Sequence, residues 1–223
     1  MPMDAAAVAL PAGWAAGTLL LACAILAWAA SRAPWRRFAS SEAVHVWYGS
    51  IFALVLLWSV RAVVADVVVI HLLGTAGFAL ASGGPLALIG GACVVVIVAL
   101  VQGTPLANVP LVFLLSVALP VAVALAFLRA TQRRLPPNFF VYVFGGAFLG
   151  PALAYGAAGL AGAAALVLTD GAAAHVVLGD YVPFLLNLAF AEATLTGMVL
   201  TLLVVYRPAW VTTFDDGRYL DRR

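Results

Sequence analysis

Long apolar stretches that alternate with short charged segments place the strongest constraint on how this chain can fold. Hydrophobic residues make up 65% of the 223 residues and charged residues only 9%, whereas about a quarter of the residues of a soluble domain are charged. A helix of about 20 apolar residues is long enough to span the hydrocarbon core of a bilayer. The sequence therefore predicts an all-α, polytopic bundle of transmembrane helices that forms a single integral membrane domain over residues 1–223.

The apolar stretches predict about seven membrane spans. The stretch 138–169 exceeds the length of one straight crossing, because its 32 residues would extend roughly 48 Å as a helix, against a core of about 30 Å. We expect this helix to be tilted, or broken at its glycines. We also expect a kink at Pro120, because the proline nitrogen cannot donate to the preceding turn. The predicted spans are residues 12–31, 44–63, 67–82, 86–102, 109–130, 138–169 and 182–206, followed by a charged tail, 207–223.

The arginines predict how these spans are oriented. All 11 basic residues are arginine, and cytoplasmic loops carry the excess of positive charge in membrane proteins. With the N-terminus outside and the C-terminus in the cytoplasm, ten of the 11 arginines face the cytoplasm, and only Arg61 faces outward, beside Asp66. This pattern predicts a multi-pass protein of the bacterial inner membrane. The net charge of +2 is too small to indicate nucleic-acid binding.

The sequence gives no indication of an enzyme. It contains no lysine, and a P-loop needs a lysine to reach the phosphates of ATP. It also lacks a Gly-x-Ser-x-Gly nucleophile elbow and a His-Glu-x-x-His zinc motif. If the protein takes part in ATP-driven transport, another subunit must hydrolyse the ATP.

His71 places a titratable imidazole inside the apolar run 67–74. A polar side chain at membrane depth is unfavourable unless it has a partner or a function. Two interpretations stay open. His71 either hydrogen-bonds a neighbouring helix and stabilises the bundle, or it binds a ligand.

The predicted topology places His71 on the outer side of the membrane together with His175 and the N-terminal Met1. Imidazoles and an amine nitrogen are suitable donors for nickel, cobalt or copper ions. His71, His175 and Met1 are therefore candidate metal ligands, although for His175 the role of a solvated loop residue is the favoured interpretation. His45 lies near the other end of its span, beside the arginine-rich loop, and we expect it to be an interfacial residue.

Glu192 lies near the middle of the last predicted span. A carboxylate at this depth must be paired, protonated or turned toward a polar cavity. It either forms an interhelical hydrogen bond that holds the bundle together or belongs to a gate or polar pathway, and the sequence does not decide between these roles.

Several motifs, taken in order, resemble those of one family, the CbiM-like permeases. These are the substrate-specific membrane subunits of energy-coupling factor ABC transporters for cobalt and nickel. The likeness covers residues 44–220 and includes the number of spans and the outside N-terminus. The segments that carry it are His71-Leu72-Leu73-Gly74, Leu135-Pro136-Pro137-Asn138-Phe139-Phe140-Val141-Tyr142, Glu192-x-x-x-x-Gly197-Met198, Tyr206-Arg207-Pro208-Ala209-Trp210 and Thr213-Phe214-Asp215-Asp216.

The resemblance implies a metal pocket near the outer surface, with a transmembrane coupling subunit and a pair of cytoplasmic ATPases as partners. Cobalt or nickel would be the cargo, and no permanently bound cofactor is implied. The family's pocket uses the extreme N-terminus, including an early histidine, and a second histidine in a His-x-x-Gly-like segment, which corresponds to His71. The early histidine has no counterpart here, because Ala9 stands at that place, before a degenerate Leu10-Pro11 opening.

Two alternative functions stay open at this point. The same fold could carry an organic solute or a metal chelate, since the early histidine is missing. A b-type haem electron carrier would need two histidines as axial ligands. The predicted topology argues against that function, because it places His45 and His71 toward opposite faces of the membrane.

Overall fold

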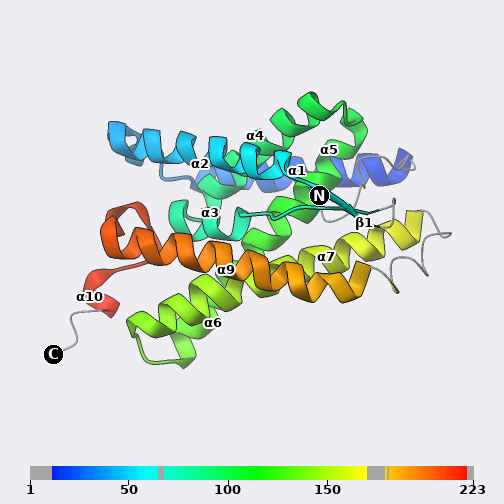
Figure 1. Ribbon diagram of the computed structural model, residues 1–223. Coiled ribbons are helices and arrows are strands. Elements are labelled where there is room, and N and C mark those ends of the chain that lie inside the picture. The colour runs from blue at the N-terminus through cyan, green and yellow to red at the C-terminus, as the bar shows by residue number, and fades with distance from the viewer. Residues whose placement is uncertain (1–11, 65–67, 170–178, 180, 220–223) are drawn as a thin grey trace.

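The computed structural model describes residues 12–64, 68–169, 179 and 181–219, and it shows a bundle of helices that lie roughly side by side (Figure 1). Six helices in these ranges are long and apolar enough to cross a membrane. The prediction of an all-helical, multi-pass membrane bundle is therefore confirmed. The main helices are α1 (Ala12–Arg32), α2 (Ser41–Ser59), α4 (Gly84–Gln102), α6 (Leu119–Arg134), α7 (Gly150–Thr169) and α9 (Val182–Tyr206).

Shorter elements connect or extend these helices. They are η1 (Trp35–Ala39), the strands β1 (Ala62–Val64) and β2 (Val68–Ile70), α3 (Thr75–Ser82), η2 (Leu106–Asn108), α5 (Val109–Phe113), η3 (Leu114–Ala118), η4 (Val141–Leu149), η7 (Pro208–Trp210) and α10 (Asp216–Tyr219).

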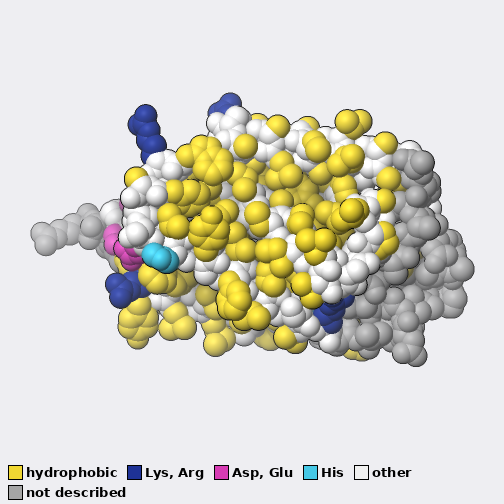
Figure 2. All heavy atoms as spheres, turned by 90° about the horizontal axis from the view of Figure 1, so that it is seen from above, with side chains coloured by type: hydrophobic (Ala, Val, Ile, Leu, Met, Phe, Trp, Pro, Cys, Tyr) yellow, Lys and Arg dark blue, Asp and Glu magenta, His cyan; other side chains and the backbone are white. Residues whose placement is uncertain are grey.

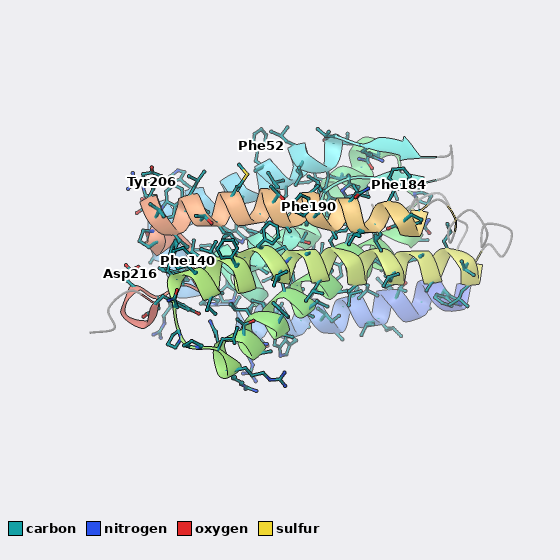
Figure 3. The ribbon with its side chains drawn as sticks, turned by 60° about the horizontal axis from the view of Figure 1, so that its bottom comes forward. Phe52, Phe140, Phe184, Phe190, Tyr206 and Asp216 are labelled. Carbon is teal, nitrogen blue, oxygen red and sulfur yellow. The ribbon has the colours of Figure 1, made fainter. Side chains whose placement is uncertain are left out.

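The outer surface of the bundle is apolar, as lipid contact requires. Figure 2 shows hydrophobic side chains across the face in view, with charged side chains near its edges. On α9, Phe184, Phe190 and Tyr206 are exposed (Figure 3). Hydrocarbon is as apolar as these side chains, so their exposure carries no cost inside a bilayer.

The third predicted span, 67–82, is not one continuous helix, and this part of the prediction is corrected. Its described part consists of β2, which pairs antiparallel with β1, then a loop, and then α3, which has only 8 residues. Two features explain the difference: β-branched residues fill β2, and Gly74 adopts a φ of 65°, which interrupts a right-handed helix. The strand pair and α3 lie end to end beside the long helices (Figure 1), so the segment traverses the bundle in a broken form.

Pro120 is the second residue of α6, which directly follows the π-helical turn η3. Proline has no N–H for the carbonyl four residues earlier, which belongs to Ser116. The hydroxyl of Thr75, the first residue of α3, donates to that carbonyl at 3.0 Å. The carbonyl to which Pro120 cannot donate thus accepts a hydrogen bond that connects this helix to α3.

The long stretch 138–169 forms η4 and α7 without a non-helical gap, with Asn138 accepting from the Phe140 amide at 2.7 Å as a cap. Its wide π-helical turns contain Gly145 and Gly146. A Cβ atom added at Gly146 would lie 2.8 Å from the Leu128 side chain on α6. These glycines therefore permit close packing against α6.

The described part of the predicted tail, 207–219, folds back onto one end of the bundle, which we call the arginine-rich end. This end carries Arg36 and Arg37 before α2, Arg133 and Arg134 on α6, and Arg207 after α9. The tail contributes buried side chains to a core cluster that also includes residues of α3, η4 and α9. The buried members of this cluster are Leu80, Leu128, Tyr142, Ala147, Leu200, Val204, Val211, Phe214 and Tyr219.

Candidate functional site

The segment between β2 and α3, residues 71–74, forms a buried loop that we call the His71 loop. His71 is 5% exposed and Leu73 is 1% exposed. Irregular backbone is tolerated at membrane depth only where it is enclosed by protein or lines a cavity, because lipid cannot satisfy its polar groups. The partners of this backbone therefore show how the bundle holds the loop in place.

Side chains from two different helices bind the carbonyl groups of the loop. The Tyr155 hydroxyl of α7 donates to the His71 carbonyl at 3.1 Å. The Trp58 indole of α2 donates to the Leu73 carbonyl at 2.8 Å. The carbonyl of Gly74 accepts from the amide of Phe78 within α3 at 3.0 Å.

Glu192 of α9 binds the amide groups of the same loop. The Leu73 amide donates to Oε2 at 2.9 Å, and the Gly74 amide donates to Oε1 at 2.7 Å. A carboxylate offers only acceptors and matches this pair of donors. Glu192 is 1% exposed and caps the N-terminal side of α3 from another helix. The sequence left open whether Glu192 forms a hydrogen bond that holds the bundle together or belongs to a gate or polar pathway. The two hydrogen bonds to the loop correspond to the first of these roles.

The imidazole of His71 has a defined orientation within this frame. Its Nδ1 lies 2.9 Å from the carbonyl oxygen of Leu72. Since a carbonyl only accepts, Nδ1 carries the proton and the lone pair of the neutral ring is on Nε2. The ring also lies against Trp58, with a centroid separation of 5.1 Å. Ligating histidines are commonly arranged in this way, with one ring nitrogen bound to a backbone carbonyl and the other free for the metal.

Two buried hydroxyl groups near the loop have no hydrogen-bond partner among the described residues, those of Ser116 and Tyr181. Ser116 is tied to α3 through its own carbonyl, and Tyr181 is close enough to Tyr155 to interact with it electrostatically. Burial raises the pKa of Tyr181, so its phenol remains protonated and can donate. The surroundings of the His71 loop are thus more polar than the lipid-facing surface.

The other histidines do not join His71 within the described residues. His175 and Met1 lie outside them, so their part in a site stays a prediction. His45 is exposed near the start of α2, whereas His71 contacts Trp58 near the end of that helix. Thirteen residues of helix separate these positions by about 20 Å, so His45 and His71 cannot ligate one haem. In the described ranges no group of three His, Cys, Asp or Glu side chains is suited to hold a metal ion.

Sequence reasoning missed the aromatic residues that hold the His71 loop, Trp58 and Tyr155. Each has a polar atom and lies within a long apolar segment. When buried, such side chains need a hydrogen-bond partner. The available signal was therefore the presence of aromatic donors inside predicted spans, but it does not identify the acceptor.

Comparison with protein families adds a decisive observation. The model of the family described as the cobalt uptake substrate-specific transmembrane region, CbiM, matches residues 6–210. The chain belongs to the CbiM family. No curated protein and no solved structure gives a significant match. Membership makes this chain a substrate-specific membrane component of cobalt uptake, in a family whose members work in multi-subunit transporters.

Proposed function

We propose that this CbiM-family chain is the substrate-binding membrane component of an energy-coupling factor ABC-type uptake transporter in the bacterial inner membrane. The cargo is a divalent transition metal, cobalt or nickel, taken up from the outer side. The observation that carries the proposal is the arrangement of His71, whose Nδ1 is bound to a carbonyl so that Nε2 bears the lone pair.

Imidazole nitrogen is a good donor for cobalt and nickel, but one imidazole does not complete a coordination sphere. Within the proposal, the N-terminal amine of Met1 and the imidazole of His175 are the candidates for the remaining protein donors. The sequence offers Ala9 where the family has an early histidine, so this site has fewer imidazoles than the family's pattern. A chelated metal or an organic solute needs fewer protein ligands, which makes it the alternative cargo.

The energy source in this proposal lies outside the chain. A P-loop requires a lysine, which this sequence lacks. A transmembrane coupling subunit and a pair of cytoplasmic ATPases therefore complete the transporter. In this proposal the arginine-rich end faces the cytoplasm, because positively charged segments are found mainly on that side of the membrane.

Metal binding by the purified full-length protein in detergent tests the proposal. We expect calorimetry to show stoichiometric binding of Co²⁺ or Ni²⁺, and the affinity of His71→Ala to be lower by at least about tenfold. Loss of a residue that only orients a metal ligand costs about this much affinity, and loss of the ligand itself should cost no less. His45→Ala is the matched control, since it removes an exposed imidazole and should bind metal as the wild type does.

The outcomes separate the cargo classes. Equal affinity in wild type and His71→Ala would contradict the role of His71. Absence of binding to both proteins with all divalent ions tested would exclude a free metal ion as the cargo. A chelated metal or an organic solute would then remain as the candidate cargo.

A further inference from the structure

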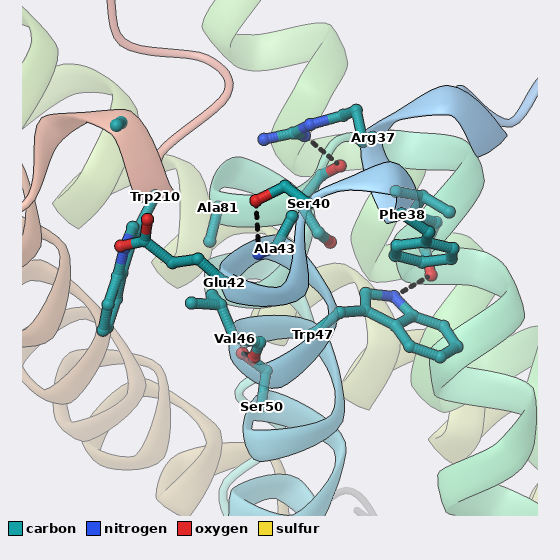
Figure 4. A pocket seen from close by; sticks show the side chains of 13 residues that line it. Arg37, Phe38, Ser40, Glu42, Ala43, Val46, Trp47, Ser50, Ala81 and Trp210 are labelled. Atoms are coloured by element: carbon teal, nitrogen blue, oxygen red, sulfur yellow. Dashed lines mark hydrogen bonds between the residues drawn. The ribbon is translucent and has the colours of Figure 1, made fainter.

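Two hollows lie next to each other near the arginine-rich end, and together we call them the channel. The first, the head pocket, has a volume of about 190 Å³ and lies between η1, the start of α2, the end of α3 and Trp210 (Figure 4). The second, the tail groove, has a volume of about 290 Å³ and lies between α2 and α9, with α3 as its floor. Ser50 and Ala81 line both of them, so the two hollows are adjacent.

The two parts of this channel differ in chemistry. The tail groove is lined mainly by apolar and small residues, among them Ala53, Leu57 and Gly77. The head pocket contains a half-buried arginine, Arg37, and serine hydroxyl groups. A pocket with charged and hydroxyl groups beside an apolar groove matches a molecule with a polar head and a hydrocarbon chain.

Charge and aromatic placement favour an anionic phospholipid. Arg37 donates to the Ser82 carbonyl at 3.5 Å, the outer limit of a hydrogen bond, and a guanidinium has five donors suited to phosphate. The one carboxylate lining the pocket, that of Glu42, accepts from the Trp210 indole at 2.7 Å. Trp47 also lines the pocket, and tryptophan side chains are typical of the boundary between lipid and water.

We propose that this channel binds one anionic phospholipid, with its phosphate at Arg37 and an acyl chain in the tail groove between α2 and α9. The acyl chain would cover α3 on the side of the tail groove, where the neighbouring helices leave α3 open to the membrane. The groove extends to Gly74, the last residue of the His71 loop. A bound lipid would therefore pack along α3 as far as the His71 loop and stabilise the helix that follows the candidate site.

Native mass spectrometry of the delipidated full-length protein, with phosphatidylglycerol or phosphatidylcholine added, tests this proposal. We expect wild type to retain phosphatidylglycerol about fivefold more than phosphatidylcholine, and Arg37→Gln to lose this preference. Arg36→Gln is the matched control, because it removes the same charge from an exposed neighbour that does not line the pocket.

A second pair of variants tests the position of the acyl chain. Ala53→Phe fills the tail groove and should weaken binding of both lipids, whereas Leu56→Phe enlarges an exposed side chain of α2 outside the groove and should not. The proposal fails if Arg36→Gln and Arg37→Gln behave alike. It also fails if Ala53→Phe retains lipid as well as Leu56→Phe does, or if wild type retains no lipid, as expected for a groove reserved for a partner's helix.

Discussion

The two ends of α3 are both held by distant parts of the chain, but by opposite chemistry. At the His71 loop, the buried Glu192 carboxylate accepts from the buried amide of Leu73 and the partly buried amide of Gly74. At the arginine-rich end, Thr212 and Thr213 donate to two carbonyls in the last turn of α3, those of Ala81 and Leu80. Part of this second end is exposed.

This comparison explains how an 8-residue helix persists inside the bundle. Isolated helices shorter than about 12 residues are marginal, and the unsatisfied groups at their ends need partners. At the exposed end, water can replace a lost partner. At the buried end nothing replaces it, so the end that carries His71 should be the more sensitive to substitution.

The largest effect on stability is expected from Glu192→Ala, which removes the acceptor of the buried Leu73 amide and of the partly buried Gly74 amide. Each unsatisfied group costs about 1–3 kcal/mol, so the two together should lower the free energy of unfolding by roughly 2–6 kcal/mol. Thermal unfolding in detergent, followed by tryptophan fluorescence, measures the change.

Glu42→Ala provides the control for this comparison. It removes an exposed carboxylate that accepts from Trp210 at the arginine-rich end, and it should cost less than about 1 kcal/mol. Equal destabilisation by the two substitutions would show that burial of the carboxylate does not decide the cost of its loss.

A smaller effect is expected from Trp58→Phe, which keeps an aromatic ring against His71 but removes the donor to the Leu73 carbonyl. Loss of this bond should destabilise the protein by about 1–2 kcal/mol and weaken metal binding several-fold. Trp47→Phe removes a comparable donor, to Leu86 at 3.2 Å, away from the loop. It should reduce stability without changing metal affinity. A loss of metal affinity in both variants would mean that general loosening, and not the placement of the loop, controls binding.

Much of the fold could be predicted because a bilayer imposes long apolar segments, and their lengths and charges are read directly from the sequence. The segment 67–82 was misjudged because apolar composition alone does not separate a helix from a strand followed by a short helix. Its irregular backbone is possible only because Glu192, Trp58 and Tyr155 bind it. Those contacts join residues that are distant in sequence, so no local pattern reveals them.

The candidate site was predictable only in part. His71 and Glu192 stood out as polar residues in apolar surroundings, and the structure brings both to the same loop. Their relation was not predictable, because it depends on the close approach of α3 and α9. A Cβ atom added at Gly77 would lie 2.8 Å from the Thr196 side chain, which shows how little space separates these helices.

A still smaller effect is expected from Thr213→Val, which changes the more exposed end of α3. This substitution keeps the side chain's shape but removes the hydroxyl that donates to the Leu80 carbonyl at 2.7 Å and contacts the Tyr142 hydroxyl at 2.8 Å. The loss should be about 0.5–1.5 kcal/mol with unchanged metal affinity, because the His71 loop keeps all its partners. Thr212→Val, at a more exposed position, should cost still less. If Thr213→Val weakened metal binding as Trp58→Phe is expected to do, the two ends of α3 would be coupled through the helix, and the arginine-rich end would influence cargo binding.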